Sequence, residues 1–105
     1  MGPLNNIQLI NRECAGMEFL VVTNISNGLV TIPSDANGAL IQVESNVATD
    51  KAIRYREDGG VPTAAVGMFI PNAGAFDLTC RKSLLDFKVI QSDAGTTKLN
   101  VIYYK

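Results

Sequence analysis

The sequence predicts an all-β fold, a jelly-roll-like antiparallel β-sandwich of about eight strands with an N-terminal arm. Three observations predict it: short runs alternate apolar and polar residues, turn-forming residues separate the runs about every 8–12 positions, and no segment sustains the period of a helix. Eight strands favour a jelly roll over the immunoglobulin fold, whose Cys–Trp–Cys core is also missing because the chain has no tryptophan.

The first 17 residues differ in character from the rest. Residues 1–17 are interpreted as an arm or a first edge strand, and residues 18–105 as the sandwich domain. Two interpretations of the arm stay open: a strand docked on its own subunit, or an arm laid on a neighbouring subunit. Its apolar side chains Ile7 and Leu9 are candidate partner contacts in the second case.

Three strands are predicted in the first half of the domain. Residues 19–23 and 29–32 are apolar and β-branched, and they flank Asn27-Gly28. That dipeptide predicts a hairpin, because both central residues of such a turn need a positive φ. Residues 39–44 then alternate apolar and polar side chains, as a half-buried strand does.

Alternation continues to the C-terminus. It predicts strands over residues 52–57, 66–70, 76–80, 85–89 and 98–103. In the first of these, Ile53 and Tyr55 take one face while Arg54 and Arg56 take the other.

Composition excludes several functions. The chain has 105 residues, which indicates one domain, and its net charge of -1 provides no basic field for nucleic acid. No apolar run reaches the roughly 18 residues of a membrane span. Histidine is absent, which excludes His-based triads and His metal clusters. The first residues lack the features of a signal peptide, so we expect a protein made and kept in a cytosol.

Cysteine and carboxylate chemistry is sparse. Cys14 and Cys80 are far apart in sequence and could form a disulfide, but two free, mostly buried thiols are favoured in a reducing compartment. Cys80 alternates with apolar residues and is expected in the core. Glu57-Asp58 would diverge at a turn, and Asp58-Gly59 is typical of turn chemistry. We therefore expect no enzyme activity and no catalytic, metal-binding or cofactor-binding residues.

Arg54 and Arg56 are the most informative polar feature. Their guanidinium groups lie roughly 6.6 Å apart along one strand face. They could form a solvated face with cross-strand acidic partners, or they could recognise carboxylates on a protein partner. Tyr103 and Tyr104 direct one ring to each face of the last strand, so one is core and the other, Tyr104, is a candidate interface anchor.

Several stretches also resemble one known class of proteins. They are Ile41–Glu44, Ile53–Gly59, Pro62–Met68 and Leu99–Tyr104. Together they resemble small tailed-bacteriophage virion proteins, in which an Arg-Tyr-Arg, Asp-Gly, Pro-Thr and Gly stretch joins two strands of a β-sandwich. The resemblance covers residues 39–104. It implies that Tyr55 points into the core, that Asp58 and Gly59 form the turn, and that Gly67 permits close packing.

The resemblance implies a structural virion protein without catalysis or cofactor. We expect a capsid decoration (cement) protein, made in the host cytoplasm and located in the virion, that binds the major capsid protein or another virion protein and stabilises the head. Such proteins are commonly trimers, so a homotrimer is expected, with no nucleic-acid or membrane partner. One alternative is a tail, neck or head-fibre module. A second alternative is a carbohydrate-binding module for host attachment.

Overall fold

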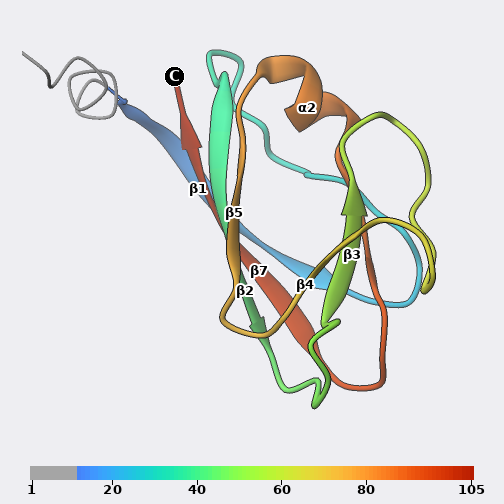
Figure 1. Ribbon diagram of the computed structural model, residues 1–105. Coiled ribbons are helices and arrows are strands. Elements are labelled where there is room, and N and C mark those ends of the chain that lie inside the picture. The colour runs from blue at the N-terminus through green and yellow to red at the C-terminus, as the bar shows by residue number, and fades with distance from the viewer. Residues whose placement is uncertain (1–11) are drawn as a thin grey trace, which may run out of the picture.

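The computed structural model describes residues 12–105, which form two antiparallel sheets and one short helix (Figure 1). One sheet has the order β1-β7-β2-β5 and the other the order β4-β3-β6. In chain order the elements are β1 (Cys14–Val22), β2 (Gly38–Ser45), β3 (Ile53–Arg56), β4 (Met68–Ile70), β5 (Ala75–Leu78), α2 (Arg81–Asp86), β6 (Lys88–Gln91) and β7 (Thr97–Tyr104). The predicted all-β class is confirmed.

The strand pairs are nested in the sequence: the first strand pairs with the last, and later strands pair with partners that lie between those two. β1 pairs with β7, β2 with β5, and β3 with β4. Between β1 and β2, Asn27 forms an isolated bridge with Val89 of β6. Nested pairing of this kind is the topology of a jelly roll. The described residues contain seven strands where about eight were predicted, because the second strand of the nest is reduced to the bridge at Asn27.

The hairpin predicted at Asn27-Gly28 does not form, and residues 29–32 are not a strand. The backbone of Asn27 instead exchanges hydrogen bonds of 3.1 and 2.8 Å with Val89. A Cβ added at Gly28 would lie 2.9 Å from the Phe87 carbonyl oxygen, so the glycine permits this close approach. Pairing with a distant strand therefore overrides the local turn preference.

A helix replaces the first part of the strand predicted over residues 85–89. In α2, Leu84 is buried and Leu85 is exposed, while Lys82 and Asp86 form an ion pair of 2.7 Å one turn apart. Six helical residues are too few to display a helical period in the sequence. The strand itself begins only at Lys88.

β1 crosses the predicted boundary between arm and domain. Its pairing with β7 runs from Cys14 opposite Tyr104 to Val22 opposite Thr97, so the last residues assigned to the arm belong to an edge strand. Figure 1 shows β1 and β7 side by side, with the C-terminus beside the start of β1. Ile7 and Leu9 lie outside the described residues.

The core lies between the two sheets. Tyr55, Phe76 and Phe87 form an aromatic cluster within it, with ring centroids 4.3 Å apart for the first pair and 5.6 Å for Tyr55 and Phe87. The predicted alternation holds here: Ile53 and Tyr103 are fully buried, as the inward residues of their strands should be. Each such side chain contributes about 1.5–3 kcal/mol on burial.

Candidate functional site

Arg54 anchors the loop between β3 and β4. It points outward from β3, where its Nε donates to the Ala64 carbonyl at 3.0 Å and its Nη1 donates to the Gly67 carbonyl at 2.8 Å. Its guanidinium carbon lies 5.3 Å from the centre of the Phe69 ring. The two hydrogen bonds fix the loop against the sheet, because each satisfies a backbone carbonyl that would otherwise need water.

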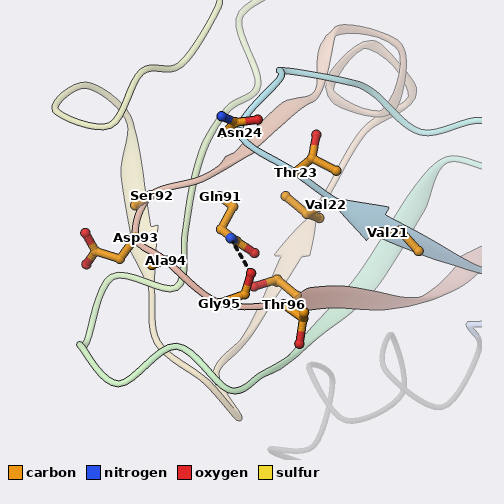
Figure 2. A pocket seen from close by; sticks show the side chains of 11 residues that line it. Val21, Val22, Thr23, Asn24, Gln91, Ser92, Asp93, Ala94, Gly95 and Thr96 are labelled. Carbon is orange, nitrogen blue, oxygen red and sulfur yellow. Dashed lines mark hydrogen bonds between the residues drawn. The ribbon is translucent and has the colours of Figure 1, made fainter.

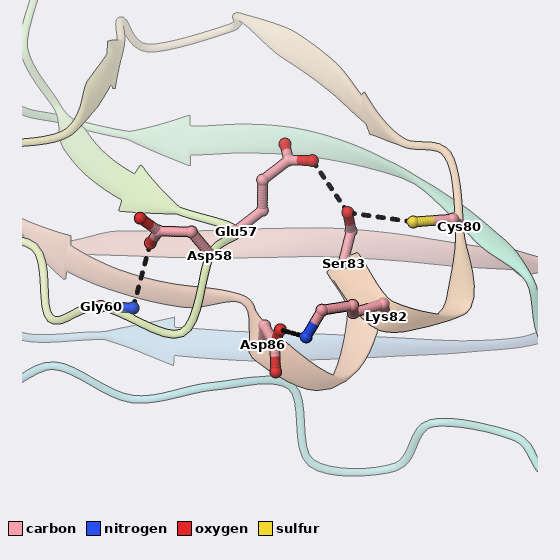
Figure 3. A network of polar contacts seen from close by, with 7 residues as sticks. All are labelled: Glu57, Asp58, Gly60, Cys80, Lys82, Ser83 and Asp86. Atoms are coloured by element: carbon pink, nitrogen blue, oxygen red, sulfur yellow. Dashed lines mark hydrogen bonds and ion pairs between the residues drawn. The ribbon is translucent and has the colours of Figure 1, made fainter.

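Arg56 fixes the start of the same loop. Its Nε and Nη2 donate to the two carboxylate oxygens of Asp58, at 3.0 and 2.6 Å, in a forked ion pair. The Asp58 carboxylate also accepts the Gly60 N–H at 3.0 Å, a contact drawn in Figure 3. The hydrogen bonds from Arg56 and then Gly60 lower the pKa of Asp58 to about 2.

Beside these arginines, the loop and the first two residues of β4 expose apolar side chains, which we call the loop surface. It consists of Val61, Val66, Met68 and Phe69, which are between 46% and 64% exposed. Phe69 lies opposite Arg54 and Met68 opposite Tyr55, so these two side chains point to different faces of the sheet. A pocket of about 290 Å³ lies at the edge of the loop surface, with Val66 and Met68 among its walls and Arg56 and Asp58 at its rim. An apolar floor with a charged rim is the usual anatomy of a protein-binding site.

A short polar chain connects the end of β3 to α2 (Figure 3). Ser83 Oγ donates to Glu57 Oε1 at 2.9 Å and lies 3.3 Å from Cys80 Sγ. The hydrogen bonds to Ser83 lower the pKa of the Cys80 thiol. Cys14 and Cys80 are both free, as favoured, but both are exposed, so the prediction that they are buried was wrong. Cys80 leaves the core because β5 ends at Leu78 and Cys80 occupies the position just before α2.

The outer face of the four-stranded sheet carries a second apolar group, which we call the β1 surface. It consists of Met17, Phe19, Val21 and Val30, which are between 61% and 71% exposed. Met17, Phe19 and Val30 line a groove of about 480 Å³ together with Glu18, Thr31 and Asn100. Polar residues normally occupy the outward positions of such a strand, so three apolar ones in succession indicate a face that is covered.

Tyr104 lies on this same sheet, half-buried at an outward position of β7. The guanidinium carbon of Arg12 stands 3.9 Å from the centre of its ring. Tyr103 is fully buried, so the predicted division of the two tyrosines between opposite faces is confirmed. Tyr104 and the two arginines Arg54 and Arg56 thus belong to different sheets and do not form one site.

A cavity lies at one end of the sandwich, between the segments Val21–Asn24 and Gln91–Thr97 (Figure 2). It holds about 700 Å³. Gln91 Nε2 donates to the Gly95 carbonyl at 2.7 Å across it. Gln91 Oε1 and Ser92 Oγ are buried atoms without a hydrogen-bond partner among residues 12–105. Their lone pairs could accept hydrogen bonds from a polar ligand or from water.

Sequence reasoning identified the arginines but missed both apolar surfaces. The signal for them is present in the runs Phe19–Val22 and Val66–Ile70, where apolar residues do not alternate with polar ones. Such runs are typical of strands covered on both faces.

Within residues 12–105, no cluster of three or more acidic or cysteine side chains could hold a metal ion. No helix in that part of the chain is long and apolar enough to cross a membrane. Comparisons with protein-family models, curated proteins and solved structures find no match for this chain.

Proposed function

We propose that this chain is a structural protein of a tailed-phage particle, a capsid decoration protein that binds capsid subunits and stabilises the head. The observation that carries the proposal is the loop surface, four exposed apolar side chains on the start of β4 and on the loop before it, which Arg54 and Arg56 hold in place. The resemblance of residues 39–104 to virion proteins supplies the partner class, and the jelly-roll topology is one that viral capsid domains use.

The mechanism is a clamp at the junction between capsid subunits. Because the loop surface is already ordered, binding loses less conformational entropy than it would for a free loop. A decoration protein that binds the assembled lattice, and not the free subunit, shifts the equilibrium towards the shell. Many weak contacts over one particle add through avidity. This role assigns the chain no catalytic step and no cofactor, and we propose a homotrimer as the form that binds.

Reconstitution onto particles that lack this protein tests the proposal. Added wild-type protein should bind and raise the temperature at which the particles release their DNA. The variant Met68→Asp should bind at least tenfold more weakly, because a charge replaces an exposed apolar contact. Leu85→Asp on α2 is a matched control, since Leu85 is 61% exposed but lies outside the loop surface. Equal heat resistance with and without the protein would contradict clamping.

Two further measurements separate the roles of the arginines and the location in the particle. Arg54→Ala with Arg56→Ala removes the loop's anchors, and unchanged capsid binding would mean that neither residue contributes to recognition. Electron microscopy of labelled particles distinguishes a decoration protein, present in hundreds of copies, from the alternative of a tail, neck or head-fibre module, present in a handful.

The cavity in Figure 2 favours a second candidate, a carbohydrate-binding module for host attachment. The unpartnered oxygens of Gln91 and Ser92 are buried, so they would accept hydrogen bonds from sugar hydroxyls only after their side chains turn towards the cavity. None of the residues that line the cavity is aromatic, so it offers no platform for stacking a sugar ring. Binding of the isolated protein on a glycan array, lost on Gln91→Ala, would establish this function in place of the first.

A further inference from the structure

β1 is apolar on both of its faces along half of its length. Leu20 and Val22 point into the core and are 6% and 2% exposed, whereas Phe19 and Val21 point outward and are 69% and 61% exposed. A strand with this composition is normally covered on both sides. No part of residues 12–105 covers the outward side. The composition of β1 is therefore that of a strand buried on both faces, although its outer face is exposed.

We propose that the β1 surface is where copies of this chain associate with one another. The surface has the size that self-association needs. Its four side chains expose roughly 500 Å² of largely apolar area, so a contact between two copies would remove about 1,000 Å², the lower bound for a specific interface. When two copies associate through the same surface, each copy contributes half of the buried area.

The surface is also shaped to receive itself. Phe19 rises beside a groove of about 480 Å³ that Met17 and Val30 help to form. The Phe19 ring of one copy can therefore enter the groove of another, and an aromatic anchor in an apolar groove is the usual centre of a binding interface. β1 lies at the edge of its sheet, so among residues 12–105 only β7 pairs with it as a strand.

The charges around the β1 surface do not oppose self-association. Lys98 stands 5.4 Å from the Phe19 ring and 3.7 Å from the carboxylate of Glu44 on the same face. Lys105 likewise lies 4.0 Å from the Glu13 carboxylate and 3.6 Å from that of Asp35. Because charges of both signs border the face, two copies meet without the repulsion that a rim of one sign would create.

This inference locates the contact between copies that the proposed homotrimer requires, whereas capsid binding uses the loop surface on the other sheet. Size-exclusion chromatography with light scattering on the full chain, over a wide range of protein concentration, measures the mass directly. Wild-type protein should exceed the mass of one chain, and Phe19→Asp should shift the dissociation constant at least tenfold towards monomer. Leu85→Asp and Met68→Asp should keep the wild-type mass, because neither residue belongs to the β1 surface.

Far-ultraviolet circular dichroism checks that Phe19→Asp is folded, and Val21→Lys provides a second variant should it not be. A monomeric wild type would overturn the inference, and so would an oligomer indifferent to both variants. An oligomer that dissociates only on Ile7→Asp with Leu9→Asp would place the contact in the arm and would also overturn it. Protein that self-associates through Phe19 but leaves capsids unprotected would retain this inference and remove the proposed function.

Discussion

The hydroxyl of Tyr103 donates a hydrogen bond to the carboxylate of Glu18 at the edge of the core. The same carboxylate accepts the backbone N–H groups of Thr31 at 3.0 Å and Val30 at 3.4 Å. Burial, reinforced by Glu18, raises the pKa of Tyr103 well above its usual range. One acidic side chain thus satisfies a buried phenol and holds the segment that the sequence predicts as a strand.

Glu18→Ala should therefore lower the free energy of unfolding by about 2–3 kcal/mol, because it leaves a buried hydroxyl and two backbone donors without their acceptor. Urea denaturation measures the change. Glu44→Ala is the matched control, since Glu44 makes an exposed ion pair with Lys98, and its effect should stay within about 0.5 kcal/mol. If both variants lose the same stability, Glu18 has no special role.

Acid should weaken the loop surface through Asp58. Its pKa is about 2 in the folded protein against 3.8 for an unperturbed aspartate, so the contribution of Asp58 to stability is complete above pH 3.8 and is lost as the pH falls through 2. The melting temperature of Asp58→Asn should lie below that of wild type at neutral pH, and the difference should shrink between pH 4 and pH 2. A difference that stays constant over this range would contradict the ion pair with Arg56.

The two thiols should differ in reactivity although both are exposed. The hydrogen bonds to Ser83 lower the pKa of Cys80, so iodoacetamide should alkylate Cys80 faster than Cys14 at neutral pH. The Ser83 hydroxyl can turn from Glu57 to donate to the Cys80 thiolate, so Ser83→Ala should slow the reaction of Cys80 and leave that of Cys14 unchanged, as followed by peptide mass spectrometry. Equal slowing at both sites would indicate a global change rather than a local hydrogen bond.

Gly67 should tolerate substitution less than Gly59, although both have a positive φ. Gly67 has φ +129, and a Cβ there would lie 3.0 Å from the Tyr55 carbonyl oxygen and 3.3 Å from Cβ of Pro62. At Gly59, with φ +85, the nearest atom would be 3.8 Å away. We expect Gly59→Ala to lower the free energy of unfolding by about 1–2 kcal/mol and Gly67→Ala by about 1 kcal/mol more. Chemical denaturation of the two variants checks the order.

Strands with one buried face were predictable because alternation reports burial directly. Residues 39–44 and 98–103 fall within β2 and β7, which extend one residue further at each end. The errors occurred where a distant partner decides the conformation. Asn27-Gly28 has a strong turn preference, yet the backbone of Asn27 forms hydrogen bonds with Val89 instead. No local sequence pattern can indicate that contact.

The candidate sites were less predictable than the fold. Arg54 and Arg56 do share one face, as the period of a strand requires, but their partners depend on the path of the following loop. The Ala64 and Gly67 carbonyls meet Arg54 only because the chain turns back over β3. The exposure of Phe19 could not be predicted either. An apolar strand has the same sequence pattern whether its second face is covered within the chain or exposed to solvent.

The nested order of the strands also governs when the fold can form. Because β1 finds its partner only in the last residues of the chain, the larger sheet cannot close while Thr97–Tyr104 are still inside the ribosome. Closure of the larger sheet must therefore wait until β7 has emerged, and pairing over so long a sequence separation makes folding slow compared with a helical protein of equal length. During that interval the apolar run of β1 is exposed, so chaperone capture and aggregation compete with maturation in the producing cell.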